Sequence, residues 1–426
     1  MVAEYFLEVK SIKCKIYKLN EFTMKKLLLL ILITFSGVTS AQSGTYTGTG
    51  SVTQGTGTVT TANLMPICAS NHTTPLGTIT ATDATIWTVP AATSFTTGPF
   101  ASDLYNPCNN VTPTSLATSN LSGVPTTIID AGGDVITAYI FSDNFFEMYI
   151  NGVLVGVDAI PFTPFNSAVV KFKVSRPYTI AVKLVDWEER VGLGSEIQSA
   201  TSLYHPGDGG FIAQFSDGTI TDASWKVQTY YIAPIENLSS VVELANGTRS
   251  TVASTVTPAC NGNCYGIHYA MPSNWNLASY SDSGWPSATI YMPTAVTNDV
   301  SYTRFATTAW PTASFIWSSN LILDNLVLAR KTVSSLSINE VKAKSLFQIA
   351  NPFSNQINIT SSENFNNLKL YLYDISGREI QKWENVTLNS GDTNYLTIEN
   401  SLTNGLYFLK IQGESVNYSI KILQSN

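Results

Sequence analysis

Residues 145–157 read FFEMYI, then NG, then VLVGV, and this stretch decides the fold of the large central part of the chain. Two alternating runs joined by Asn151-Gly152 are the strongest short-range signal for a β-hairpin, because a type I′ turn needs positive φ at both central residues. A second pair of runs, at 170–174 and 179–184, is linked through residues 175–178. Further strands are expected at 210–215, 227–232, 314–317 and 324–328.

Composition supports a chain made of β-sheets. Only 12% of the residues are charged, Thr, Ser, Gly and Asn are abundant, and long helical periodicities are missing. This balance is typical of extracellular β-sheet proteins, whose exposed faces carry hydroxyl and amide side chains. The net charge of -7 and the pI near 5.1 argue against nucleic acid as a partner, because that partner needs a basic surface.

The last ninety or so residues form a second set of short alternating runs. Asn351-Pro352-Phe353 opens this set, and the run 368–373 leads into the turn 374–378. The runs 404–411 and 418–422 follow near the end of the chain. Alternation with a period of two, bounded by Gly, Asn, Asp and Ser, indicates half-buried strands. The sequence therefore predicts an all-β protein, with a large jelly-roll β-sandwich at 64–333 followed by a small Ig-like β-sandwich at 337–426.

This C-terminal region resembles the type A C-terminal sorting domain of the type IX secretion system. The resemblance rests on several motifs in the right order, and its key residues are Asn351, Pro352, Asp374, Gly377, Arg378, Gly405 and Tyr407. It implies a bacterium of the Bacteroidetes group, export across both membranes, and the type IX secretion machinery as a partner. The expected location is the medium or the outer cell surface.

The N-terminal residues indicate a secretory signal peptide. Met24-Lys25-Lys26 precedes the apolar run 27–35 and a small-residue segment that ends at Ala41. We assign 24–41 as the signal peptide and 1–23 as a mis-assigned leader. The alternative is a long cytoplasmic tail on a membrane anchor, but the apolar run falls short of the about 20 residues that a permanent span needs.

The cysteines predict disulfides in an exported protein. Cys14 lies in the leader, which leaves four: Cys68, Cys108, Cys260 and Cys264. An even number in an exported chain favours disulfides. The expected pairs are Cys68–Cys108 and Cys260–Cys264, because each pair is close in sequence. A zinc site is the alternative, but the C-x₂₋₄-C spacing does not occur twice.

Composition and short motifs indicate the nature of the segments on either side of the hairpin. Residues 42–63 are nearly all Gly, Thr and Ser in their first part, and we expect a flexible linker or a frayed edge there. The central region resembles galactose-binding-like jelly rolls, which accompany many glycoside hydrolases and adhesins. That resemblance rests on Asp143-Asn144, on the NG hairpin, and on three further features: residues 178–182, Ser281 to Ala288, and Arg330. The insert between Asp186 and Ile235 departs from it and leaves the ligand site open.

Two loops in this insert are the candidate ligand site. The first carries Trp187, Glu188 and Glu189, and the second carries His205 and Asp208. An aromatic face with acids and amides is typical of sugar sites, whereas several Asp and Glu oxygens are typical of Ca²⁺ sites. The structural alternative is that Trp187 fills the edge of the core and Asp208 merely turns the chain.

These features favour a non-catalytic binding protein, one that binds carbohydrate or acts as an adhesin. No motif of a known catalytic class occurs, and no catalytic residue is assigned. A secreted glycoside hydrolase is the alternative, since acids crowd the insert at Glu188, Glu189, Glu196, Asp208, Asp217 and Asp222. The third possible function is that of a structural surface or matrix protein.

Overall fold

The computed structural model divides the chain into two compact units, Met1–Thr332 and Val333–Asn426. It describes residues 44–65, 72–197, 204–254, 263–334, 346–399, 401–413 and 416–425. The predicted leader and signal peptide lie outside these residues. Within them, no helix is both long and apolar enough to cross a membrane.

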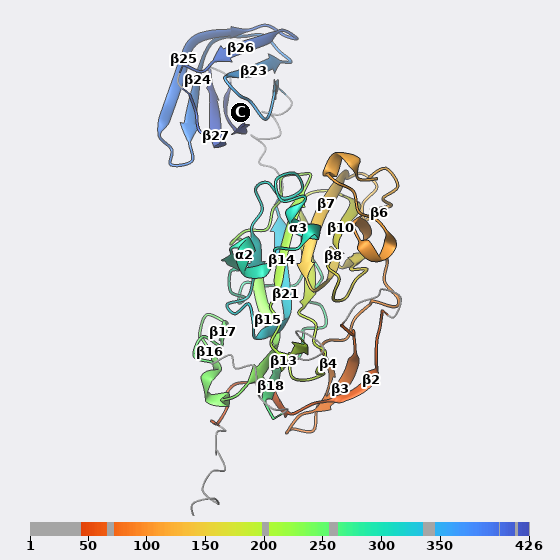
Figure 1. Cartoon of the computed structure of the whole chain (residues 1–426). Coiled ribbons are helices and arrows are strands. Elements are labelled where there is room, and N and C mark those ends of the chain that lie inside the picture. Colours follow the sequence, from red (N-terminus) through yellow and green to blue (C-terminus); the bar gives the residue numbers. More distant parts are fainter. Residues whose placement is uncertain are drawn as a thin grey trace, which may run out of the picture. The chain divides into compact units, whose positions relative to one another are not determined.

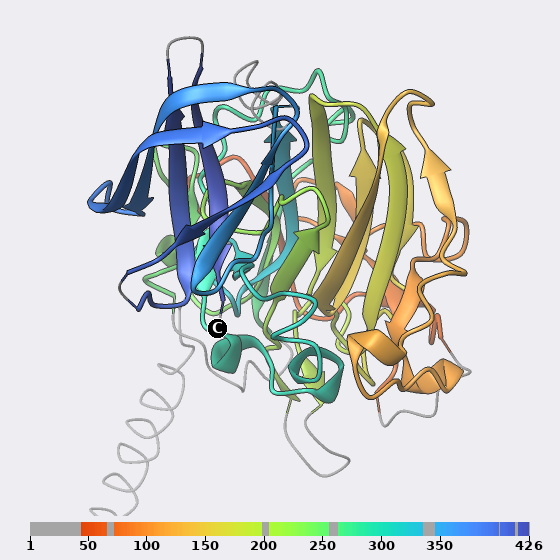
Figure 2. The same cartoon turned by 90° about the horizontal axis from the view of Figure 1, so that it is seen from above.

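The first unit contains two seven-stranded sheets, seen as the long arrows of Figures 1 and 2. In order across the first sheet, the strands are β1 (Ser51–Gln54), β18 (Tyr265–His268), β15 (Lys226–Ile235), β21 (Asp324–Val333), β11 (Tyr178–Val185), β8 (Phe145–Ile150) and β9 (Val153–Val157). In the second they are β19 (Thr289–Tyr291), β20 (Phe315–Trp317), β14 (Gly210–Phe215), β7 (Asp134–Asp143), β10 (Ser167–Val174) and β5 (Ser102–Tyr105), with β6 (Thr126–Ile128) parallel to β10.

The two sheets pack face to face. The ring of Phe172 on β10 lies 6.0 Å from that of Tyr178 on β11, at an interplanar angle of 68°. A Cβ added to Gly156 on β9 would lie 2.6 Å from Cγ2 of Val170 on β10, so glycine permits this close approach. The side chains of β11 are buried along its whole length, as expected for a strand in the core of a sandwich. The prediction of an all-β sandwich is confirmed.

The NG hairpin forms as the sequence predicts. Strands β8 and β9 pair antiparallel, and Asn151 and Gly152 have φ of 49° and 87°. The second pair of runs behaves differently. β10 and β11 belong to different sheets, so the segment between them carries the chain across the sandwich instead of closing a hairpin.

Residues 51–54 and 58–61 form strands within the segment predicted as a flexible linker or a frayed edge, so this segment is not a linker throughout. β1 forms the edge of the first sheet, and β2 (Thr58–Thr61) joins β3 (Leu76–Thr80) and β4 (Ile86–Val89) in a three-stranded sheet. The fully buried hydroxyl of Thr53 donates to the carbonyl of Gly266 at 3.3 Å and lies 3.1 Å from Nε2 of His268. Threonine favours strands. Pairing with β18 gives hydrogen-bond partners to the backbone N–H and C=O groups of this segment, a pairing that composition alone does not reveal.

Short elements connect these sheets. The two-stranded sheets are β12 (Glu196–Ile197) with β13 (Tyr204–His205), and β16 (Val242–Glu243) with β17 (Arg249–Ser250). Two short helices, α2 (Pro293–Val296) and α3 (Val300–Thr303), lie between β19 and β20 in the sequence. Three 3₁₀ turns occupy Pro107–Asn109, Leu116–Thr118 and Leu238–Ser240.

The second unit is also built from sheets. One sheet comprises β22 (Phe347–Ile349), β23 (Gln356–Ser361) and β26 (Thr393–Thr397); the other comprises β25 (Glu379–Leu388), β24 (Phe365–Asp374), β27 (Gly405–Gln412) and β28 (Asn417–Gln424). Its own core includes Phe353, Ile359, Leu370 and Leu409. Asp374 accepts from the backbone N–H groups of Ser376 and Arg378, so it stabilises the turn between β24 and β25.

Candidate functional site

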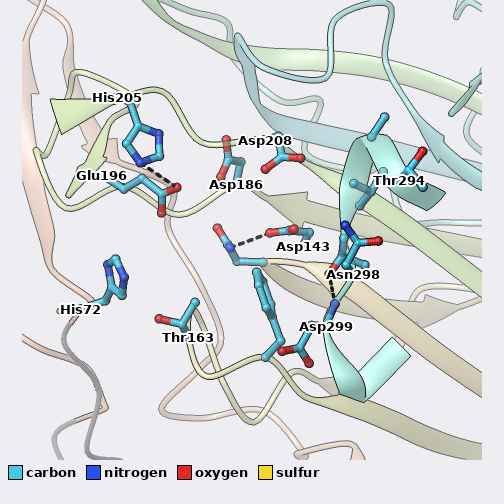
Figure 3. A pocket seen from close by; sticks show the side chains of 15 residues that line it. His72, Asp143, Thr163, Asp186, Glu196, His205, Asp208, Thr294, Asn298 and Asp299 are labelled. Carbon is cyan, nitrogen blue, oxygen red and sulfur yellow. Dashed lines mark hydrogen bonds and ion pairs between the residues drawn. The ribbon is translucent and has the colours of Figure 1, made fainter. Parts of the chain in front are cut away.

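A cavity of about 570 Å³ in the first unit is lined by five carboxylate side chains (Figure 3). Asp143 is the last residue of β7, Asp186 directly follows β11, and Glu196 opens β12. Asp208 lies between β13 and β14, and Asp299 caps the N-terminus of α3. The cavity therefore collects acids from segments that are far apart in the sequence.

Asn144 holds the ends of β7 and β11 together. Its backbone N–H donates to the carbonyl of Val185 at 3.2 Å, and its side-chain oxygen accepts from the backbone N–H of Trp187. Its side-chain nitrogen donates to Oδ1 of Asp143 at 2.7 Å. The peptide bond between Asp143 and Asn144 is cis. Because Asn144 contacts the chain on both sides of Asp186, it positions Asp143 and Asp186 at the same cavity.

Asp186 is the least compensated of these acids. Only 3% of its surface is exposed, and among the described residues its carboxylate accepts no hydrogen bond. A Cβ at position 207 would lie 2.7 Å from Oδ1 and 3.0 Å from Oδ2 of Asp186, so glycine at this position gives the carboxylate its space. Buried carboxylates are normally paired or hydrogen-bonded, because burying an unpaired charge is costly.

Burial and mutual repulsion raise the pKa values of the acids in this cavity. Burial raises the pKa of Asp143 well above its ordinary value, and the charges of Asp208 and Asp186 raise it further. The pKa of Asp186 is also raised well above the usual range, by burial and then by Glu196 and Asp208.

The two acids from the insert titrate closer to neutrality. Burial raises the pKa of Glu196 to about 7, although His72 opposes the shift. Burial raises the pKa of Asp208 to about 6, and His205 opposes it. Nε2 of His205 lies 3.8 Å from Oε1 of Glu196. At neutral pH these pKa shifts favour protonated carboxyl groups beside carboxylates in the cavity; the protonated groups can donate hydrogen bonds and the carboxylates can accept them.

The remaining lining adds an aromatic ring and neutral polar groups. Phe165 is half-buried at the cavity, and its ring lies 5.9 Å from that of Phe141 in the core. Thr163, Thr294 and Asn298 add hydroxyl and amide groups. This mixture can hold a polar ligand that also has an apolar face.

Two of the five residues predicted as ligand-binding line the cavity, namely His205 and Asp208. Trp187 does not: it is 1% exposed, and its ring packs edge-on against Phe145 at 5.8 Å. The placement of Trp187 on a ligand-binding face therefore needs correction. The reason is that the chain leaves the core only at Asp186, directly after the apolar strand β11, and returns to the core at Trp187.

Glu188 and Glu189 also have structural partners. Glu188 is fully buried, and it accepts from the backbone N–H of Gly192 at 2.9 Å, from that of Gly194, and from the Tyr231 hydroxyl at 3.2 Å. Glu189 accepts from the backbone N–H of Thr73 at 2.9 Å and lies 3.0 Å from Nδ1 of His72. Neither lines the cavity, because both are used to fix loops.

Sequence reasoning did not assign Asp143 or Asp299 to the site, and it named Asp186 only as the start of the insert and Glu196 only among the acids of the insert. The available signal was positional: Asp143 and Asp186 each stand directly at the end of a long buried strand. Acids at these positions emerge at the same end of the sandwich when the two strands run in the same direction in facing sheets.

The sequence left Ca²⁺ open as an alternative ligand of these loops. Among the described residues, no group of three or more His, Cys, Asp and Glu side chains is arranged to hold a metal ion. Ca²⁺ takes six to eight oxygen ligands, so the acids of the cavity do not form a ready-made calcium site.

Two of the four candidate cysteines are described. Cys108 and Cys264 are each disulfide-bonded. Cys68 and Cys260 lie outside the described residues, so the pairing Cys68–Cys108 and Cys260–Cys264 stays a prediction.

The C-terminal unit is decided by comparison with known families. Residues 350–424 match the family described as the secretion system C-terminal sorting domain. This tail is a type IX sorting domain. The protein is therefore secreted or displayed at the cell surface, and its sorting domain is the part that interacts with the type IX secretion machinery.

The remainder of the chain has only distant counterparts. No curated protein matches the sequence. Among solved structures, a β-D-glucuronidase of Dictyoglomus thermophilum is 10% identical, over 89% of this chain and 44% of that one, with a TM-score of 0.16. The BSP domain of a biofilm associated protein is 9% identical over 90% and 68%, with a TM-score of 0.16. A lectin of Pleurotus ostreatus, in complex with GalNAc, is 13% identical over 89% and 84%, with a TM-score of 0.14.

These likenesses carry no argument about function, because their TM-scores are low. The chain also spans less than half the length of the β-glucuronidase. Any statement about a ligand must therefore come from the cavity itself.

Proposed function

We propose that the protein is an extracellular binding protein that holds a saccharide in the acid-lined cavity. The observation that carries this proposal is the convergence of Asp143, Asp186, Glu196 and Asp208 on one cavity beside Phe165. Its export by the sorting domain brings the cavity to the cell surface or the medium, where saccharides of other organisms and of cell envelopes are found.

Saccharide chemistry suits this lining. Sugar hydroxyls donate hydrogen bonds to carboxylates and accept them from protonated carboxyl groups, and the cavity offers both at neutral pH. The ring of Phe165 provides an apolar surface on which a sugar ring can pack. A cavity of about 570 Å³ lies within the size range of ligand pockets, roughly 300–1,000 Å³.

The test is a glycan array followed by calorimetry with the full-length protein. Asp186→Asn and Asp208→Asn each replace one lining carboxylate without changing its size. We expect each to weaken binding at least about tenfold, which is about 1.4 kcal/mol. The matched control is Asp134→Asn, because Asp134 is an exposed acid at the other end of the same strand β7 as Asp143. The proposal fails if the array retains no glycan, or if the control weakens binding as much as the cavity variants.

A glycoside hydrolase is the second candidate, favoured by one specific observation. Both Glu196 and Asp208 come from the insert after Asp186, and both line the cavity with pKa values near neutrality. Hydrolysis needs one protonated acid and one carboxylate on either side of the bond. Release of reducing ends from a bound glycan, abolished by Glu196→Gln, would establish this activity. Binding without release would exclude it for that glycan.

A further inference from the structure

We infer that the cavity selects saccharides that carry an amino group, such as deacetylated amino-sugar oligomers, over neutral and acidic ones. This inference rests on the proposed saccharide-binding function and names the chemical class of its ligand. It follows from the charge of the lining, from the state of Asp186, and from the arrangement of the acids.

The charge of the lining is one-sided. Five carboxyl side chains border the cavity, together with two histidines, His72 and His205, whereas the described residues of its lining include no lysine and no arginine. The chain does use basic side chains to balance acids elsewhere: Lys183 pairs with Glu147 at 2.9 Å, and Arg176 pairs with Asp217 at 2.6 Å. Among the described residues, the cavity acids therefore lack the lysine and arginine partners that other buried and half-buried acids of the same unit have.

Asp186 supplies independent evidence for a positively charged occupant. Asp186 borders the cavity, and only 3% of its surface is exposed. Within the described part of the chain, its carboxylate has neither a hydrogen-bond donor nor a cation beside it. Gly207 keeps the space beside this carboxylate free of a side chain. Figure 3 shows the carboxyl groups of Asp143, Asp186 and Asp208 directed toward the same space.

An ammonium group fits this space better than a metal ion does. A divalent cation needs several oxygen ligands at fixed short distances, and the described acids form no group of three with that arrangement. An ammonium group carries one positive charge and three N–H donors, so it can bridge two or three carboxylates without a fixed coordination sphere. Burial and repulsion raise the pKa values of these acids, and the positive charge of a bound cation would lower them by attraction.

The same lining opposes other saccharide classes. The carboxylate of a uronic acid would join five carboxyl side chains in the cavity, and the described lining holds no lysine or arginine to receive it. An N-acetylated sugar retains its hydroxyl groups but has lost the positive charge. Comparison of these classes therefore isolates the amino group.

The experiment measures binding of the full-length protein to three oligosaccharides of equal length by calorimetry. The ligands are a fully deacetylated glucosamine oligomer, its fully N-acetylated counterpart and a uronic acid oligomer, at a pH where the amino groups are protonated. We expect the deacetylated oligomer to bind at least about tenfold more tightly than the N-acetylated one. Asp186→Asn and Asp208→Asn should remove this preference, and Asp134→Asn should leave it intact.

The outcomes separate this inference from the function on which it rests. Equal binding of the deacetylated and N-acetylated oligomers would overturn selection of the amino group and leave saccharide binding standing. No binding of any saccharide, here or on the array, would overturn both. A preference that Asp134→Asn weakens as much as Asp186→Asn would show general attraction to an acidic protein, and would also overturn the inference.

Discussion

Nε of Arg330, on β21, donates to Oδ2 of Asp282 at a distance of 3.0 Å. The same guanidinium donates to the carbonyls of Leu277 at 3.2 Å and Tyr280 at 3.1 Å, and also to that of Trp275. One side chain thus fixes the segment 275–282 against the sheet. Sequence motifs grouped Asp282 and Arg330 in one resemblance, and the structure gives their relationship a physical basis.

Replacement of Arg330 by Met should destabilise the first unit strongly. Arg330 is 1% exposed, and its loss removes the donor to the Asp282 carboxylate and to the carbonyls of Trp275 and Tyr280, whereas the Leu277 carbonyl still accepts from the N–H of Tyr280. Removing one partner of a buried ion pair costs about 3–5 kcal/mol, and the 23% exposure of the Asp282 side chain places the effect near the lower end. Chemical denaturation measures the loss. Lys331→Ala, the next residue on β21, is the control and should change stability by about 0.5 kcal/mol or less. Similar losses in both variants would contradict the role of Arg330.

Replacement of Gly207 by Ala should impair the cavity. The added Cβ would lie 2.7 Å from Oδ1 of Asp186, so the carboxylate must move from its position. We expect at least about a tenfold loss of affinity for the saccharide found on the array, measured by calorimetry. Gly123→Ala is the control, because nothing lies within 4 Å of its added Cβ. Unchanged affinity in Gly207→Ala would show that the position of Asp186 does not govern binding.

Replacement of Trp187 by Ala should reduce stability, by about 3–5 kcal/mol, because the indole is buried against Phe145. Trp187→Phe should cost less, since it keeps an aromatic ring and the buried indole N–H has no hydrogen-bond partner among the described residues. Thermal melting of the two variants tests this order. A stable Trp187→Ala variant that has lost saccharide binding would instead support the placement of Trp187 on a ligand-binding face.

The hairpin and the sorting unit could be predicted because their signals are local. Asn151-Gly152 specifies its turn within two residues, and the alternation of 368–373 specifies β24 directly. The cavity could not be predicted in the same way. Its acids come from the ends of two strands in different sheets and from an insert, and only the packing of the sheets brings them together.

Burial of charged residues was the other limit of the sequence. Glu188 and Glu189 look exposed in the sequence, yet backbone N–H groups and His72 hold them inside. Likewise, the Thr- and Gly-rich segment that contains β1 has the composition of a linker. Its partner strand β18 lies more than two hundred residues away, so no local pattern could reveal the pairing.

Asp158 should make the first unit less stable as the pH rises. Burial raises the pKa of Asp158 to about 8, against about 3.9 in an unfolded chain. The folded state therefore retains a proton that the unfolded state releases, so stability is lost progressively between about pH 4 and pH 8. Asp158→Asn keeps an oxygen that can accept from Asn166 at the 2.8 Å contact and has no proton to lose.

The measurement is the melting temperature of the wild type and of Asp158→Asn at several values between pH 5 and pH 8. The melting temperature of Asp158→Asn, relative to that of the wild type, should increase steadily with rising pH. The difference in melting temperature between Asp134→Asn, whose side chain is exposed, and the wild type should stay constant. A constant difference between Asp158→Asn and the wild type across this range would contradict the prediction.

Deletion of residues 337–426 should stop export at the periplasm. The matched sorting domain at 350–424 lies wholly within the deleted segment. Fractionation and immunoblotting of the deletion strain measure the distribution of the protein. The control replaces the same residues with a Gly/Ser segment of equal length, which should also remain in the periplasm. Arrival of either variant at the cell surface would show that the first unit carries its own sorting information.

The pairing of β1 with β18 sets an order of events during synthesis. Thr53 and His268, in contact across this pair, are 215 residues apart in the sequence. A ribosome releases β1 long before its partner exists, so the edge of this sheet cannot close while most of the first unit is still being translated. Contacts of such long range also form slowly. Strand β1 therefore stays without its partner until β18 has been made, when about five-eighths of the chain has been translated.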